Sequence, residues 1–211
     1  MPVWYEYRLV KPRTLLAFGA AGLAAGAYWA RTHPSACPYG LRVLLGPRPF
    51  ISRERLLEVL DPAPGERILE VGPGTGYYTL DVAARLDGGS LAAFDVQQEM
   101  LDHLMREAGA RGISNVEPTA GDARALPYPD ASFVAAYLVT VLGEVPDQDA
   151  ALRELYRVLE PGGRLVVGEL ALGDPHFVTP GKLFAATDAA GFTLERRVGP
   201  PFGYFALLRR R

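Results

Sequence analysis

The chain has 211 residues, of which 49% are hydrophobic and 22% are charged, and its formal net charge at pH 7 is −2. This length supports one full hydrophobic core, and the composition excludes a disordered chain. A single cysteine excludes an internal disulfide framework and a cysteine-cluster metal site, and the three scattered histidines lack the spacing of metal ligands. We therefore expect one α/β domain without a bound metal.

Charge is unevenly distributed along the chain. Residues 1–53 contain seven Lys and Arg and one acidic residue, a net charge of +6, whereas the remainder contains 15 basic and 23 acidic residues, a net charge of −8. The basic, apolar N-terminal quarter favours contact with an anionic surface such as lipid headgroups. The acidic remainder argues against a large nucleic-acid interface.

Residues 14–30 carry no charge and are bounded by Arg13 and Arg31. This run is at the lower limit for a bilayer-spanning helix, which needs roughly 20 residues, and much of it is alanine and glycine. Two interpretations stay open: an N-terminal membrane anchor, or a hydrophobic helix packed on the domain or on a partner chain. A cleaved lipoprotein-type signal before Cys37 is least favoured, because Pro34 stands where an aliphatic residue is wanted.

Four prolines punctuate residues 31–50, which predicts an irregular linker or lid. Residues 52–60 are predicted to form a short amphipathic helix, which the proline- and glycine-rich turn 61–65 stops. The sequence thus divides into an N-terminal helix and linker, residues 1–51, and an α/β domain, residues 52–211.

A glycine-rich turn follows the apolar run 67–71, and a helical pattern begins after it. The run predicts a buried parallel strand. Glycine occupies every second position of the turn, at Gly72, Gly74 and Gly76, so that backbone N–H groups can approach a ligand without an intervening Cβ.

The spacing of these glycines and the residue before them indicate the ligand. Dinucleotide sites space the glycines G-x-G-x-x-G and bind a pyrophosphate at the helix N-terminus. Here the spacing is G-x-G-x-G, and Glu70 stands two residues before the first glycine. A carboxylate at that position would repel a pyrophosphate but attract an ammonium group.

Residues 70–76 resemble the first motif of class I S-adenosylmethionine-dependent methyltransferases, whose cosubstrate carries an α-amino group and no phosphate. Two further stretches are similar to motifs of that family: residues 128–133, Y-P-D-A-S-F, and residues 160–167, E-P-G-G-R-L-V-V. Val134 departs from the pattern, since the family usually has an aspartate there. The resemblance covers residues 52–211 and implies S-adenosylmethionine as cosubstrate and a cytoplasmic location, where that compound is made.

Asp95 lies 19 residues after Gly76, at the end of the predicted strand 91–94. An acidic residue at this position accepts both ribose hydroxyls of an adenosine ligand, so Asp95 by itself does not exclude NAD. Val96 and Gln97 follow and would border the adenosine. A second role for Asp95, as N-cap of the helix 97–108, is compatible with the first.

The resemblance implies further cosubstrate contacts after the next two strands. In the family, an acidic residue at the position of Asp122 accepts a hydrogen bond from the adenine amino group, and the next backbone N–H, here that of Ala123, contacts the ring. Val139 would lie near the ligand, with Leu138 and Thr140 as alternatives because the phase of strand 134–142 is open.

Methyl transfer is an in-line attack on an activated sulfonium methyl, so the protein mainly supplies alignment and desolvation. A base is needed where the acceptor arrives protonated. His176 is the predicted base by its intrinsic pKa, with Glu144 and Glu169 as orienting or proton-accepting carboxylates. The alternative is that His176 fixes the turn at Asp174 and Pro175.

The alternation of elements predicts an α/β, Rossmann-like, doubly wound seven-stranded sheet with an antiparallel C-terminal strand. The predicted strands are residues 67–71, 91–94, 116–120, 134–142, 165–169, 192–198 and 204–209. The predicted helices are residues 52–60, 78–86, 97–108, 149–159 and 179–190. All the site residues fall at the carboxyl ends of strands, where ligands bind in such sheets.

The function predicted from these features is S-adenosylmethionine-dependent methyl transfer to a small-molecule acceptor of lipid- or quinone-like type, at the inner face of the membrane if residues 14–30 anchor there. Two alternatives stay open. One is a nucleotide-binding oxidoreductase, which the glycine spacing and Glu70 oppose. The other is a non-catalytic S-adenosylmethionine-binding protein. Methylation of protein or nucleic-acid amino groups is disfavoured, since no Asn-Pro-Pro-Tyr/Phe motif follows residues 134–142.

Overall fold

The computed structural model describes residues 36–44 and 46–211. The described residues belong to one compact unit, and the hydrophobic helix predicted at residues 14–30 lies outside them. Within the described part, no helix combines the length and the hydropathy that crossing a bilayer requires.

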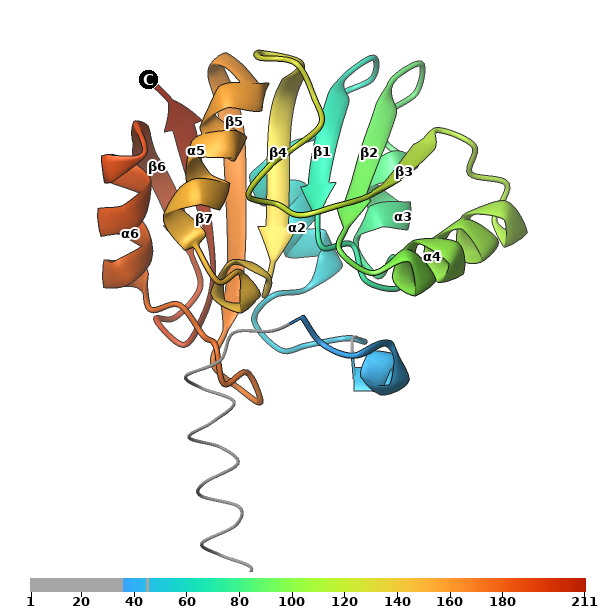
Figure 1. Ribbon diagram of the computed structural model, residues 1–211, viewed down its shortest axis with the longest axis horizontal. Coiled ribbons are helices and arrows are strands. Elements are labelled where there is room, and N and C mark those ends of the chain that lie inside the picture. The colour runs from blue at the N-terminus through green and yellow to red at the C-terminus, as the bar shows by residue number, and fades with distance from the viewer. Residues whose placement is uncertain (1–35, 45) are drawn as a thin grey trace, which may run out of the picture. The chain divides into compact units, whose positions relative to one another are not determined.

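A seven-stranded sheet in the order β3-β2-β1-β4-β5-β7-β6 forms the centre of the unit (Figure 1). The first five strands run parallel, and β7 is antiparallel to both of its neighbours, which confirms the predicted topology. Because β1 lies between β2 and β4, the chain reverses its direction of winding at the end of β1, where such folds bind ligands. The strands are β1 Arg67–Val71, β2 Ser90–Asp95, β3 Val116–Ala120, β4 Phe133–Val139, β5 Leu159–Leu170, β6 Phe192–Val198 and β7 Gly203–Arg210.

Helices cover both faces of the sheet and close two hydrophobic clusters. Buried leucines of α2, α3 and α4 pack on one face with Ile68 and Tyr137. Those of α5 and α6 pack on the other face with Leu69 and Phe133. The helices are α2 Arg53–Leu60, α3 Thr79–Ala83, α4 Gln98–Ala110, α5 Gln148–Val158 and α6 Pro180–Ala189, and two 3-10 helices are η1 Tyr39–Leu44 and η2 Leu142–Glu144.

The structure corrects the predicted end of the fourth strand. The strand predicted to reach residue 142 ends at Val139, and Thr140 adopts a left-handed backbone with φ of 56°. This conformation turns the chain out of the sheet and into η2. Apolar residues at 141 and 142 extended the hydrophobic pattern beyond the strand, because both pack near the sheet without pairing in it.

The predicted proline- and glycine-rich turn before strand five is an excursion within β5. Leu159 pairs with Phe133, and pairing resumes at Arg164 opposite Ala135, so residues 160–163 loop out of the ladder. Gly162 has φ of 76°, which a residue with a Cβ rarely adopts.

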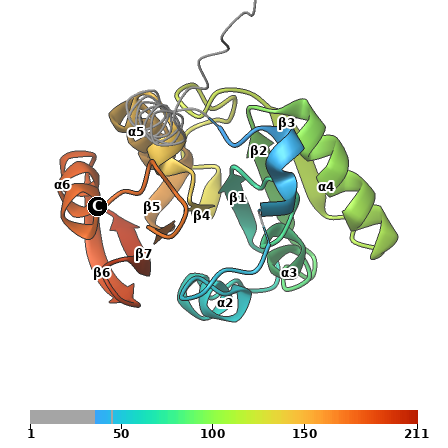
Figure 2. The ribbon, with the colours of Figure 1, turned by 90° about the horizontal axis from the view of Figure 1, so that it is seen from below.

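The segment of residues 36–51, here called the strap, passes along the carboxyl ends of the parallel strands (Figure 2). It includes η1, whereas the sequence predicted an irregular linker there. Ile51 is fully buried and its carbonyl accepts a hydrogen bond of 2.6 Å from the Tyr78 hydroxyl. The predicted division at residue 51 remains a prediction, but in the structure the strap folds with the sheet.

Candidate active site

The glycine turn between β1 and α3 lies against the end of the sheet. Its glycines have φ of 72°, 54° and 89° at Gly72, Gly74 and Gly76. A Cβ on Gly72 would lie 2.3 Å from Val141, and a Cβ on Gly76 would lie 2.5 Å from Leu104. Both the backbone conformation and the close packing therefore require glycine, and they leave the turn able to receive a ligand at short range.

Glu70, near the end of β1, is a buried carboxylate with 2% exposure. Its Oε2 atom has no hydrogen-bond partner in the described part of the chain, and neither do the nearby hydroxyls of Thr79 and Tyr137. Burial raises the pKa of Glu70 to about 7, although Thr79 and Tyr137 favour the ionised form. A cation delivered to this carboxylate would supply the missing partner and bring the pKa down.

Asp95 ends β2 and holds the glycine turn. One carboxylate oxygen accepts a hydrogen bond of 3.3 Å from the Gly74 backbone N–H, and the other accepts one of 2.9 Å from the Gln97 N–H. Burial raises its pKa, and these bonds oppose the rise. The residue is 7% exposed, and it lies directly beside the turn. Val96 beside it is 61% exposed.

The Gln97 side chain binds the strap. Its amide nitrogen donates to the Cys37 carbonyl at 2.9 Å, and its amide oxygen accepts from the Tyr39 backbone N–H at 3.2 Å. The sequence predicted this residue at the adenosine border. The structure commits its amide group to the strap, which the sequence could not indicate, and its contact with adenosine stays a prediction.

The residues predicted to contact adenine lie at the end of β3. Asp122 is bound by the Arg124 guanidinium at 2.6 Å, which lowers the pKa of its carboxyl to about 2. Ala123 packs against the hydrophobic cluster on the α5 face. Val139 ends β4 with 8% exposure, which makes it a candidate for contact with a ligand above the strand ends.

Glu144, in η2, is the predicted acceptor-side carboxylate. Its Oε2 atom accepts a hydrogen bond of 3.3 Å from the Cys37 backbone N–H of the strap. Burial raises its pKa to about 7, the Cys37 bond opposes this, and the acidic side chains of Asp174 and Asp95 raise it further. A carboxyl group with this pKa can accept or release a proton near neutral pH.

Glu169 lies near the end of β5 and is buried, with 1% exposure. Its Oε2 atom accepts a hydrogen bond of 3.1 Å from the Val178 N–H, whereas Oε1 has no partner in the described residues. Burial raises its pKa well above the usual value. The Tyr204 hydroxyl donates a hydrogen bond of 2.8 Å to the Val178 carbonyl, so the backbone of Val178 connects Glu169 with Tyr204.

His176 lies in the loop between β5 and α6, and its backbone N–H donates to the Asp174 carboxylate at 2.7 Å. A Cβ on Gly143 would lie 1.9 Å from the His176 carbonyl oxygen, so the loop packs directly on η2. This supports the interpretation in which the loop is held by the turn at Asp174, and the role of the imidazole as base stays a prediction.

The sequence did not single out Arg48, and it indicated Thr140 only as an alternative to Val139. The Arg48 guanidinium donates a hydrogen bond of 2.7 Å to the Thr140 hydroxyl, from the strap to the residue after β4. A lone arginine in a proline-rich stretch gives no signal of this contact. The left-handed backbone of Thr140, unusual for a β-branched residue, is visible only in the structure.

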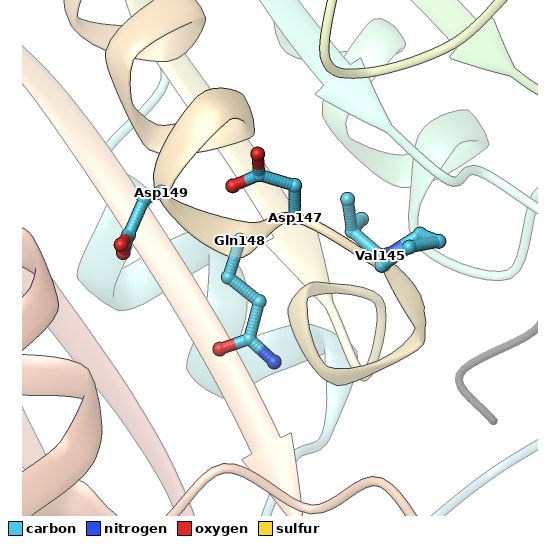
Figure 3. Close-up of a pocket in the computed structure, with 5 residues that line it drawn as sticks. Val145, Asp147, Gln148 and Asp149 are labelled. Atoms are coloured by element: carbon cyan, nitrogen blue, oxygen red, sulfur yellow. The ribbon is translucent and has the colours of Figure 1, made fainter. Parts of the chain in front are cut away.

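A shallow pocket of about 450 Å³ lies at the start of α5, lined by the consecutive residues 145–149 (Figure 3). In the close-up, the side chains of Asp147, Gln148 and Asp149 point in three different directions. Asp147 is occupied as the helix N-cap, accepting from the Ala150 N–H. Since no polar groups converge there, we place the site at the glycine turn.

Comparison with known proteins agrees with this geometry. Residues 68–163, from β1 into the excursion of β5, match the family model described as a methyltransferase domain. This part of the chain is therefore similar to a methyltransferase domain. The matched range contains the glycine turn, Asp95, Asp122 and Glu144, so most of the residues predicted to bind the cosubstrate lie within it.

Curated members of the family extend the comparison. This chain is 42% identical over 118 residues to a demethylmenaquinone methyltransferase of Thermus thermophilus, a match that covers 56% of this chain and 53% of that protein. It is 37% identical over 140 residues to a ubiquinone/menaquinone biosynthesis C-methyltransferase of Escherichia coli, covering 64% of this chain and 53% of that protein. The chain thus spans about half the length of these relatives.

Solved structures show the same fold. A methyltransferase from Aquifex aeolicus superposes with a TM-score of 0.74 at 20% identity, covering 82% of this chain and 98% of that one. The cyclase SpnF superposes with a TM-score of 0.67 at 26% identity, covering 75% and 79%. This fold is therefore found in proteins whose names describe different reactions.

Proposed function

We propose that the protein binds S-adenosylmethionine at the glycine turn and transfers its methyl group to a small, quinone-like aromatic acceptor. The observation that carries the proposal is Glu70: a buried carboxylate with an unpartnered oxygen, beside a turn that is closed to side chains and open to a ligand. The methionine ammonium would satisfy that oxygen, and Asp95 would accept the ribose hydroxyls.

When bound, S-adenosylmethionine supplies an activated methyl group, and the remaining tasks belong to the chain. Glu70 and the glycine turn hold the amino-acid end, and Asp95 holds the ribose. The strap, held to Gln97 and Glu144, shields the strand ends from water. With a pKa of about 7, the Glu144 carboxylate can take the hydroxyl proton of an acceptor.

The acceptor class is supported by the relatives, whose names describe methylation of quinone precursors. It comes to this chain as part of the proposal, since the match covers about half of each relative. The acidic charge of residues 54–211 supports a small acceptor over a nucleic acid.

Calorimetry with S-adenosylmethionine and with NAD tests the cosubstrate. We expect the wild type to bind S-adenosylmethionine and not NAD, and Glu70→Gln to weaken that binding by about 1–3 kcal/mol. Methyl transfer to a panel of hydroquinones, phenols and phospholipids then tests the reaction. Binding of NAD instead, or equal affinity in the Glu70 variant, would contradict the assignment of the turn.

A second function is favoured by the similarity to SpnF, a protein named as a cyclase. On this alternative, the chain binds S-adenosylmethionine without transferring its methyl group. Tight binding together with no S-adenosylhomocysteine formation on any acceptor of the panel would support it.

We further propose that the protein works in the cytoplasm at the inner face of the membrane, through residues 14–30. The uncharged run between Arg13 and Arg31 and the +6 charge of residues 1–53 support this location. Flotation with anionic liposomes tests it: the full chain should float, and a chain truncated to begin at residue 32 should not. If neither floats, the run does not bind membranes.

A further inference from the structure

Arg48 brings a positive charge into a group of carboxylates at the ends of β4 and β5. The guanidinium is half-buried and donates to the Thr140 hydroxyl at 2.7 Å. Burial raises the pKa values of Glu144 and Asp174, and the positive charge of Arg48 opposes the rise in both. Arg48 therefore lies near η2 and the loop that follows β5.

The backbone around this contact is specialised. Thr140 holds its hydroxyl toward Arg48 from a left-handed conformation that β-branched residues rarely adopt, a kind of strain that is often found at functional sites. On the other side, the strap reaches Glu144 through the Cys37 N–H. The strap thus contacts Thr140 through the Arg48 guanidinium and Glu144 through the Cys37 N–H, and these two contacted residues are four positions apart.

A guanidinium and a carboxyl group of pKa about 7 have complementary chemistry toward a hydroxylated aromatic ring. The carboxylate can accept the hydroxyl proton, and the oxygen anion that remains matches the donors of the guanidinium. An amine acceptor would gain nothing from Arg48, because its developing charge has the same sign.

We propose that Arg48 is an acceptor-binding residue that pairs with the ionised oxygen of a phenol or hydroquinone. In this step the O–H proton moves to the Glu144 carboxylate and the electron pair stays on the oxygen, which Arg48 stabilises. The inference rests on the proposed function and narrows it to acceptors that carry an acidic hydroxyl group on an aromatic ring. The strap, which precedes the motifs shared with the family, thereby supplies part of the acceptor site.

Two probes that differ in one ionisable group test this inference without turnover. Calorimetry with 2-naphthol and 2-methoxynaphthalene, both in the presence of saturating S-adenosylhomocysteine, measures what the hydroxyl contributes. We expect the wild type to bind the naphthol about 10- to 100-fold more tightly than the ether, as a charged hydrogen bond would give. Arg48→Met should lose that preference, and Arg48→Lys should keep part of it.

A matched control and a second pair of variants distinguish the loss of the Arg48 contact from a loss of folding. Arg196→Met removes an arginine of β6 that pairs with Glu58 at 3.8 Å, remote from the strap, and should keep the full preference. Thr140→Ser retains the hydroxyl and should behave as the wild type, whereas Thr140→Gly should reduce the preference. Thermal melts should show that each variant is folded.

The outcomes separate the inference from the proposed function. If Arg48→Met keeps the preference for the naphthol, or if the wild type binds neither probe, the inference is overturned. It is also overturned if the loss in Arg48→Met falls on S-adenosylhomocysteine, because Arg48 would then bind the cosubstrate carboxylate. Failure of the wild type to bind S-adenosylmethionine would instead overturn the proposed function.

Discussion

The Asp95 carboxylate accepts a hydrogen bond from the backbone N–H of Gly74, which lies 21 positions earlier in the chain. This bond joins the end of β2 to the glycine turn after β1. A single side chain therefore holds the turn in place, and under the proposed function its remaining acceptor capacity would bind a ribose. Its two roles can be separated by substitution.

Replacing Asp95 separates the loss of charge from the loss of acceptors. Asp95→Ala removes both, and we expect affinity for S-adenosylmethionine to fall by about 1–3 kcal/mol for each charged hydrogen bond lost. Asp95→Asn keeps one acceptor oxygen and should fall between the wild type and the alanine variant in calorimetry. Asp87→Ala, at an exposed position before β2, is the control. Wild-type affinity in Asp95→Ala would rule out the ribose role.

The stability of the ligand-free protein should depend on pH through Glu70 and Glu144. Both have a pKa of about 7 in the folded chain, above the ordinary glutamate value of 4.5, so the folded state binds more protons between these values. Their contribution is fully present below pH 4.5 and is lost as the pH rises through 7. The loss per group is about 3 kcal/mol at most.

Urea denaturation at pH 5 and pH 8 measures that dependence. Glu70→Gln and Glu144→Gln should each reduce the difference in the free energy of unfolding between the two pH values, because glutamine does not titrate. If both variants show the wild-type difference, these carboxyl groups do not have raised pKa values.

Two glycines with left-handed backbones distinguish conformational strain from steric collision. Gly88 has φ of 73° with open space around it, whereas a Cβ on Gly76 would lie 2.5 Å from Leu104. We expect Gly88→Ala to lower the free energy of unfolding by about 1–2 kcal/mol. Gly76→Ala should add a packing cost of about 1–3 kcal/mol. Chemical denaturation that finds equal losses would show that Leu104 moves aside freely.

Arg157 of α5 fixes the loop that precedes β4. Its guanidinium donates to the carbonyls of Leu126 and Tyr128 at 2.9 and 2.7 Å, and it pairs with Glu154 and Asp130 at 2.8 Å each. Arg157→Met leaves the two carbonyls without this donor and should lower the free energy of unfolding by about 2–4 kcal/mol.

The matched control for this variant is Arg153→Met, at an exposed position of the same helix. It should change stability by less than about 0.5 kcal/mol. Losses of similar size in the two variants would mean that the carbonyls find water in place of the guanidinium.

The sequence was sufficient for elements whose patterns are local. Strands β1, β3 and β6 have the predicted bounds, because a glycine directly follows each of them and marks the turn that ends the strand. The same reasoning failed at the end of β4, where the apolar pattern continues but Thr140 turns the chain away. A hydrophobic pattern indicates that residues are buried. It does not show whether they pair within the sheet or only pack next to it.

Sequence by itself determined the identity of the predicted cosubstrate groups, since Glu70, the three glycines and Asp95 lie at fixed distances along one β-α-β unit. Only the tertiary structure brought together the residues that we propose for the acceptor side. The strap meets Gln97, Thr140 and Glu144 through contacts that span 58 to 107 positions of chain. Such contacts leave no periodic trace in the sequence, because each depends on where the sheet brings two distant segments together.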